Sequence, residues 1–151
     1  MIKKLTTNNK EDVQNLFLSV FSKPPWNDVW DLEEQLPKYM TDLMDNQNSL
    51  CLGYYQEDQL IGISLGYVFH WWEGTDYFIK EFCIDSELQG AGHGKRFLGE
   101  MNELLKSESI KAIWLMTERT TPAYSFYQKN GFFELKDNVM FAKSVKEATV
   151  E

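Results

Sequence analysis

The chain has 151 residues, a length typical of one domain with its own core. Apolar residues make up 43% of it, a proportion that excludes disorder throughout. Its 23 acidic and 15 basic residues give a net charge of −8, which would repel a phosphate backbone, so we predict no nucleic-acid partner. A small cationic molecule would instead be attracted.

Neither a targeting segment nor a disulfide framework is indicated. No run approaches the roughly 18 apolar residues that span a bilayer, and the N-terminus lacks the apolar region of a secretory signal. The two cysteines, Cys51 and Cys83, each lie in a short apolar run of strand character. We therefore expect a cytoplasmic protein with no membrane partner.

The first part of the chain is predicted to form a short extended segment and two or three helices. Residues 2–6 are extended in character, and Asn8 with Glu11 has the spacing of an N-cap and its capping-box partner. A helical stripe follows and ends at the Pro24-Pro25 pair: Val13, Leu16, Phe17, Val20 and Phe21. A second stripe starts near Leu32, and Pro37 within it predicts a kink or two short helices.

From residue 50 the pattern becomes that of strands. Segments 49–56, 59–69 and 75–85 are rich in β-branched and aromatic residues. Glu57 and Asp58 form a tight turn between the first two segments. These features predict an antiparallel meander.

The remaining elements complete a mixed α/β (α+β) domain. A helical stripe near residues 97–105 precedes a buried strand at 112–117. A short helix then starts after Thr121 and ends before Gly131, and strands at 132–136 and 138–144 close the domain. We expect residues 1–144 to form one domain and 145–151 a frayed tail.

A glycine-rich segment, DSELQGAGHGKRF, connects the third strand of the meander to the next helix. Its three alternating glycines allow close approach of a ligand, and free amides at the helix start suit a phosphate or pyrophosphate, with Lys95 and Arg96 adding positive charge. Dinucleotide and P-loop motifs beginning at Gly90 would both need a glycine at position 95. A glycine-rich connection without a ligand is the alternative.

Two motifs together resemble those of the GNAT-type N-acetyltransferase superfamily. Gln89, Gly92 and Gly94 fit the acetyl-CoA loop pattern Q/R-x-x-G-x-G/A. A second pattern, A-x-x-F-Y-x-x-x-G-F, is matched after the next strand by Ala123, Phe126, Tyr127, Gly131 and Phe132. The chain looks like a small bacterial member similar to aminoglycoside or polyamine acetyltransferases.

The resemblance implies a GNAT-like, mostly antiparallel sheet of six to seven strands, splayed between the fourth and fifth and flanked by about four helices. It also implies acetyl-CoA as co-substrate, with its pantetheine arm pairing with the main chain of Cys83 and Ile84. Thr120 stands where the family usually has asparagine. The implied pyrophosphate loop comprises Gln89, Gly90, Ala91, Gly92, His93, Gly94 and Lys95.

Two residues are candidates for catalysis. A lysine-like amine with a pKa of about 10.4 is charged at neutral pH and must lose a proton before it attacks a thioester. Glu81, among apolar neighbours on the strand that the resemblance places beside the thioester, is the candidate base; binding the cationic substrate and plain surface exposure are its other interpretations. Tyr127 matches the family's tyrosine that protonates the leaving thiolate, with core packing as its alternative.

Aromatic and acidic residues gather in two segments that could bind a cationic acceptor. The candidates are Trp26, Asp28 and Trp30 in the first segment and Trp71, Trp72 and Glu73 in the second, where Asp76 follows. Packing or a homodimer face is the alternative for these tryptophans. His70 and His93 have no third ligand at suitable spacing, so we predict no metal.

These observations predict an acetyl-CoA-dependent N-acetyltransferase that acts on a primary amine of a small cationic acceptor by direct attack in a ternary complex. One rival function is acetylation of a protein or peptide amino group. The other is a non-catalytic acyl-CoA-binding module.

Overall fold

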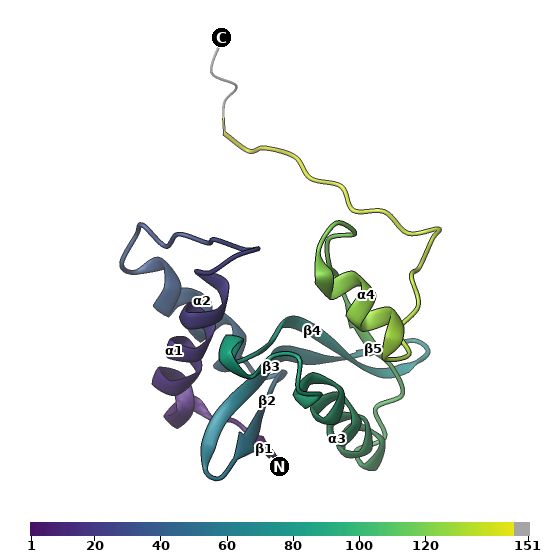
Figure 1. Cartoon of the computed structure of the whole chain (residues 1–151). Helices are drawn as coiled ribbons and strands as arrows, with labels where there is room; N and C mark the ends of the chain where they lie inside the picture. Colours follow the sequence, from purple (N-terminus) through teal and green to yellow (C-terminus); the bar gives the residue numbers. More distant parts are fainter. Residues whose placement is uncertain (147–151) are drawn as a thin grey trace.

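The computed structural model describes residues 1–146, which form a five-stranded sheet with helices on both faces (Figure 1). The strands lie in chain order across the sheet, and only the last pair is parallel. They are β1 (Ile2–Lys4), β2 (Ser49–Gln56), β3 (Gln59–Trp71), β4 (Gly74–Ile84) and β5 (Ile113–Leu115). The predicted meander of β2, β3 and β4 is thereby confirmed.

Four helices and two 3-10 turns complete the described chain. The helices are α1 (Lys10–Phe21), α2 (Gln35–Met44), α3 (His93–Ser107) and α4 (Pro122–Lys129), with turns η1 (Thr7–Asn9) and η2 (Ser86–Leu88). Apolar residues of α1 and α2 pack on one face of the sheet against Ile63 and Leu65. Those of α3 pack on the other face against Ile61 and Tyr77. The sheet therefore separates two cores.

The first helices start differently from the sequence prediction. The capping box pairs Thr6 with Asn9 around η1, not Asn8 with Glu11. The expected kink at Pro37 is also wrong, because α2 begins at Gln35 and is a single helix. Pro37 lies in its first turn, where a missing amide hydrogen breaks no helical hydrogen bond.

The two strands predicted at 132–136 and 138–144 are absent from the described chain, so the sheet has five strands and not six or seven. The segment has strand-like residues but no neighbouring strand to supply hydrogen bonds. At its base, the Glu134 carboxylate pairs with Arg119 and accepts a hydrogen bond from Tyr124. The chain then leaves the domain beyond α4 (Figure 1). Of the predicted frayed tail, residues 147–151 lie outside the described residues.

The sheet is splayed between β4 and β5, as predicted. Their parallel pairing covers three positions and ends with Ile79 opposite Leu115. A bulge next to that point leaves Lys80 without a partner in β3, while β4 continues to Ile84. Residues 80–84 of β4 therefore have no β5 residue beside them.

Candidate active site

Glu81 lies on β4 where the splay begins, on the face covered by α1 and α2. The hydroxyl of Tyr39, on α2, donates a hydrogen bond of 3.1 Å to the Oε2 atom of Glu81. Burial raises the pKa of the Glu81 carboxyl, and the negative charge of Asp28 adds to this, while the Tyr39 hydrogen bond and Lys80 lower it. The result is a carboxyl group with a pKa above its usual range, a property suited to a general base.

Tyr127, on α4, lies across the splay from Glu81. Its ring packs edge-on against Phe82 of β4 and Phe132, with centroids 6.2 and 5.3 Å away. Burial raises the pKa of the Tyr127 hydroxyl, and the nearby Cys83 and Glu81 raise it further. The Tyr127 hydroxyl therefore stays protonated at neutral pH, and its ring packs against the neighbouring aromatic side chains.

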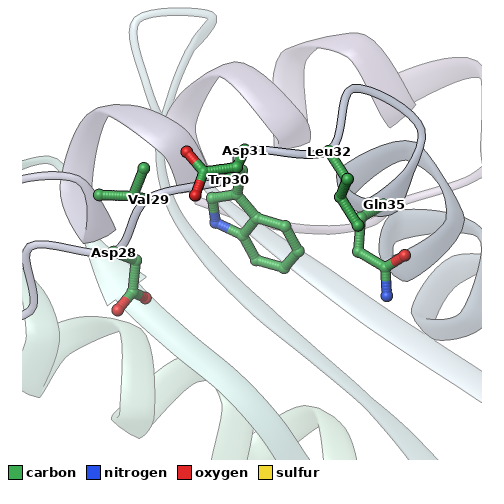
Figure 2. A pocket seen from close by; sticks show the side chains of 6 residues that line it. All are labelled: Asp28, Val29, Trp30, Asp31, Leu32 and Gln35. Atoms are coloured by element: carbon green, nitrogen blue, oxygen red, sulfur yellow. The ribbon is translucent and has the colours of Figure 1, made fainter.

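The loop between α1 and α2 contains an acidic pocket next to these residues. Figure 2 shows Asp31 next to the Trp30 indole and the Asp28 carboxylate pointing away from it, and the complete lining is Asp28, Val29, Trp30, Asp31, Leu32 and Gln35. The Trp30 ring stacks on Tyr39 at 5.7 Å, which connects the pocket to Glu81 through one side chain. The Nε1 atom of Trp30 is buried and has no hydrogen-bond partner in the described chain.

Trp26 and Trp30 also have packing roles. Trp26 lies 5.5 Å from the Phe21 ring, and Trp30 lies 6.0 Å from that of Phe17. Both tryptophans therefore fix the acidic loop against α1. Trp30 can pack and bind at once, because it contacts Phe17 and also lines the pocket.

The second predicted group of substrate residues lies elsewhere. Trp71, Trp72 and Glu73 are exposed at the turn between β3 and β4, which Figure 1 places on the opposite side of the molecule from the loop between α1 and α2. The structure therefore does not bring the six candidates into one pocket. The indole N–H of Trp71 donates 3.0 Å to Asp76 Oδ2, a contact that anchors the turn.

Asp76 is the centre of a buried cluster that the sequence did not reveal. Its carboxylate also accepts 2.7 Å from the Trp114 indole and lies 3.1 Å from the Lys111 ammonium group. These contacts hold the pKa of Asp76 below its usual range, against the effect of burial. The cluster joins the turn at Trp71 to the beginning of β5, and so fixes where the splay starts.

The glycine-rich loop begins with Gln89, whose side-chain amide donates 3.0 Å to the carbonyl oxygen of Ile84. Gly90 and Gly92 have left-handed backbones, with φ of 86° and 84°. Gly92 is the N-cap of α3 and has no side chain to cap the first amides, so these remain free for an anion. His93 is the buried residue of this loop and packs against Tyr54.

Arg96 is an additional charged residue in this loop. Its guanidinium group folds back to donate 3.0 Å to the carbonyl oxygen of Ala91 and approaches His93 Nδ1 at 3.2 Å. Lys95, next to it, is exposed. Gly94 serves packing, since a Cβ atom there would lie 2.8 Å from the ring of Phe126 on α4. Thr120 is exposed, immediately before the N-cap of α4.

The described residues 1–146 include no helix long and apolar enough to cross a membrane. Within the same range, no three side chains of the histidine, cysteine, aspartate and glutamate types gather as a metal site would require. The two cysteines are buried and unpaired.

The family model described as Acetyltransferase (GNAT) family matches residues 11–132. The chain therefore belongs to the GNAT family of acetyltransferases. The fold and splay described above are therefore those of an acyltransferase. Members of this family use acetyl-CoA. No curated protein matches the sequence.

Solved structures share the fold at low identity. An aminoglycoside acetyltransferase from an uncultured soil metagenomic sample, in complex with sisomicin, has a TM-score of 0.73 at 18% identity, covering 97% of this chain and 96% of that one. AAC(6')-Iy with a CoA-linked acetylneamine analog has a TM-score of 0.72 at 12% identity, covering 95% and 97%. A possible acetyltransferase from Clostridium difficile 630 has a TM-score of 0.80 at 15% identity, covering 97% of each chain.

Proposed function

We propose that the protein transfers an acetyl group from acetyl-CoA to a primary amine of a small cationic acceptor. The observation that carries this proposal is that Tyr127 of α4 packs on Phe82, next to Glu81 in the part of β4 that has no β5 residue beside it, while burial raises the pKa of Glu81. A carboxyl that can accept a proton and a hydroxyl that can donate one are the two groups that this reaction needs. Family membership supports the choice of reaction.

The glycine-rich loop fits the diphosphate of acetyl-CoA. It combines the uncapped amides of α3, two left-handed glycines, and the positive charges of Lys95 and Arg96. We assign the diphosphate to residues 89–95, with Arg96 added, and the pantetheine arm to the unpaired part of β4 at Cys83 and Ile84. Thr120, just before α4, remains a candidate contact to CoA.

We propose that the transfer is direct and takes place in a ternary complex. Glu81 removes a proton from the ammonium group of the acceptor, directly or through water, and the neutral nitrogen attacks the thioester carbonyl carbon. A carbon–nitrogen bond forms, and the carbon–sulfur bond breaks as the tetrahedral intermediate collapses. Tyr127 gives its proton to the departing thiolate, which leaves as free CoA thiol. The reaction thus needs no residue to carry the acetyl group.

The acidic pocket is the proposed acceptor site. Asp28 and Asp31 supply negative charge, Trp30 supplies an aromatic face for an ammonium group, and Tyr39 connects this pocket to the base. The sisomicin complex of the similar soil-metagenome protein supports an aminoglycoside-like acceptor. Trp71, Trp72 and Glu73 belong to a separate surface, so we do not assign them to this pocket.

Release of CoA thiol in the presence of aminoglycosides, polyamines and peptides tests the proposal. Glu81→Gln and Tyr127→Phe are each expected to lower kcat by at least tenfold while leaving acetyl-CoA affinity within about threefold. Matched controls are Glu103→Gln, an exposed residue of α3, and Tyr124→Phe on α4, which are expected to retain activity. Initial-rate lines that intersect support a ternary complex, and parallel lines contradict it.

Each rival function has its own outcome in the same experiment. Turnover with peptides alone would replace the small-amine acceptor by a protein amino group. Thermal stabilisation by acetyl-CoA without thiol release for any acceptor would indicate a binding module. Unchanged turnover in both the Glu81 and the Tyr127 variants would overturn the catalytic assignment.

A further inference from the structure

The glycine-rich loop of residues 89–95 is anchored at both ends by the rest of the domain. At one end the Gln89 side chain is hydrogen-bonded to the end of β4. At the other end His93 is buried beside the Tyr54 ring. Ala91 lies between these anchors and is exposed. The loop therefore needs a further contact if Ala91 is to keep one position.

Glycines on both sides of Ala91 make this part of the loop easy to deform. Gly90 and Gly92 have φ of 86° and 84°, in the left-handed region that glycine adopts without strain. Glycine also has more conformational freedom to lose on ordering than any other residue. A loop held only at its ends would therefore sample other backbone conformations at these two positions, and its amide groups would not stay directed at one anion.

The Arg96 side chain supplies the missing contact. Its Nη2 atom donates a hydrogen bond of 3.0 Å to the carbonyl oxygen of Ala91 and lies 3.2 Å from His93 Nδ1. In residues 1–146 no other hydrogen bond reaches that carbonyl oxygen. One guanidinium group thus ties the middle of the loop to its buried end.

The two cations of the loop differ in what they contact. The Arg96 guanidinium lies against Gly92, where a Cβ atom would be 3.0 Å from Nη1, so the glycine leaves the space that this contact uses. The Lys95 side chain is exposed and makes no ion pair with the described residues. Arg96 is therefore engaged by the loop itself, whereas Lys95 is available only as a charge.

We propose that Arg96 is a positioning residue, which holds the loop in its anion-binding conformation before acetyl-CoA binds and acts through its two loop contacts more than through its charge. This inference rests on the proposed function, in which the loop receives the diphosphate. Ordering a flexible loop on binding reduces affinity, so a loop that is ordered beforehand binds more tightly. Arg96 therefore affects acetyl-CoA binding and leaves the chemical step unchanged.

Backbone amide relaxation, measured by NMR on the ligand-free protein, tests the contact itself. Order parameters are about 0.85 for rigid backbone and below about 0.6 for flexible segments. Gly90, Ala91 and Gly92 are expected near the higher value in the native chain and below the lower one in both Arg96→Met and Arg96→Lys. Lysine keeps the charge but lacks the planar group that reaches two acceptors at once. Lys95→Met is the matched control and should keep the native order parameters.

Affinity and turnover separate the conformation of the loop from its charge. The Kd of acetyl-CoA, measured by calorimetry, is expected to rise about fivefold in Arg96→Met and by a similar factor in Arg96→Lys. The kcat of both variants should stay within about twofold of the native value. Lys95→Met also weakens binding, but its effect should shrink as salt rises, whereas the effect of Arg96→Lys should persist. Lys106→Met, in the last turn of α3, should bind like the native chain.

Two results overturn the proposal. One is native affinity with native order parameters in Arg96→Lys, which would assign Arg96 a role through charge alone. The other is a loop that stays ordered in Arg96→Met, or that becomes flexible there with no loss of affinity. If the native chain binds no acetyl-CoA, the proposed function fails and this inference fails with it, whereas the two results above contradict the role of Arg96 alone.

Discussion

The buried cluster around Asp76 makes a strong prediction about stability. Asp76 has no exposed surface, and its carboxylate receives the indole groups of Trp71 and Trp114 and the ammonium group of Lys111. Replacing Asp76 by leucine removes the common acceptor of three donors and keeps a side chain that branches at the same atom, although leucine is larger. The donors come from β3, from the approach to β5 and from β5 itself, so the change loosens the junction that positions the splay.

The expected loss follows from the exposure of each donor. A hydrogen bond to a charged group contributes about 1.5–3 kcal/mol. Trp71 and the Lys111 side chain are 36% and 42% exposed, so water can replace the carboxylate at both. The Trp114 indole is less accessible and loses most of its bond. We therefore expect Asp76→Leu to cost about 2–3 kcal/mol, which corresponds to a fall in Tm of about 5–10 °C for a chain of this size.

Thermal denaturation followed by circular dichroism measures this loss. Glu73→Leu, an exposed acidic residue in the same turn, removes one charge without a buried partner and should melt within about 2 °C of the native protein. The pKa of Asp76 is depressed in the folded state, so its contribution is present above pH 3.8 and is lost as the pH falls through the lower folded value. The native and Asp76→Leu curves should therefore keep a constant gap from pH 5 to 8 and converge only below about pH 4. A native-like Tm for Asp76→Leu at pH 7 would refute the assigned role.

Two further predictions concern the active site and the loop. Tyr39→Phe removes a hydrogen bond that lowers the Glu81 pKa, so the acidic limb of kcat/KM should move to higher pH, with the plateau above it retained, when thiol release is measured across pH. If the acidic limb of the pH profile does not move, the group that titrates there is not the carboxyl bonded to Tyr39. Gly94→Ala places a Cβ atom 2.8 Å from the Phe126 ring and should cost about 1–3 kcal/mol in urea unfolding, with kcat reduced because α4 shifts. Its control, Gly99→Ala on the same helix, meets nothing within 4 Å and should stabilise α3 by about 0.5–1 kcal/mol.

Local sequence patterns predicted those elements whose signals are local. The helical stripe before Pro24 became α1, and the β-rich segments became the meander, because spacing alone determines which face of an element is apolar. The α4 helix also followed its cap signals, with Thr121 before it and Gly131 in a left-handed conformation after it. The glycine-rich loop fell between strand and helix as its motif required.

Contacts between distant segments could not be predicted in the same way. The Tyr39 hydrogen bond to Glu81 joins residues 42 positions apart and depends on how α2 crosses β4. The sequence places Asp76 with the aromatic and acidic candidates of its turn, since no local pattern shows that Lys111 and Trp114 cover it. Both contacts can be predicted only when the order of strands in the sheet and the helices that cover it are known.

In the C-terminal segment, residues 133–146, the propensity to form a strand and the observed structure differ. Residues 138–144 have the composition of a strand, yet a strand is defined by its hydrogen-bonded neighbour and not by its own residues. In the described chain this segment lies away from every strand, and Glu134 near its start contacts Arg119 and Tyr124. Propensity alone therefore does not place a segment beside a neighbouring strand.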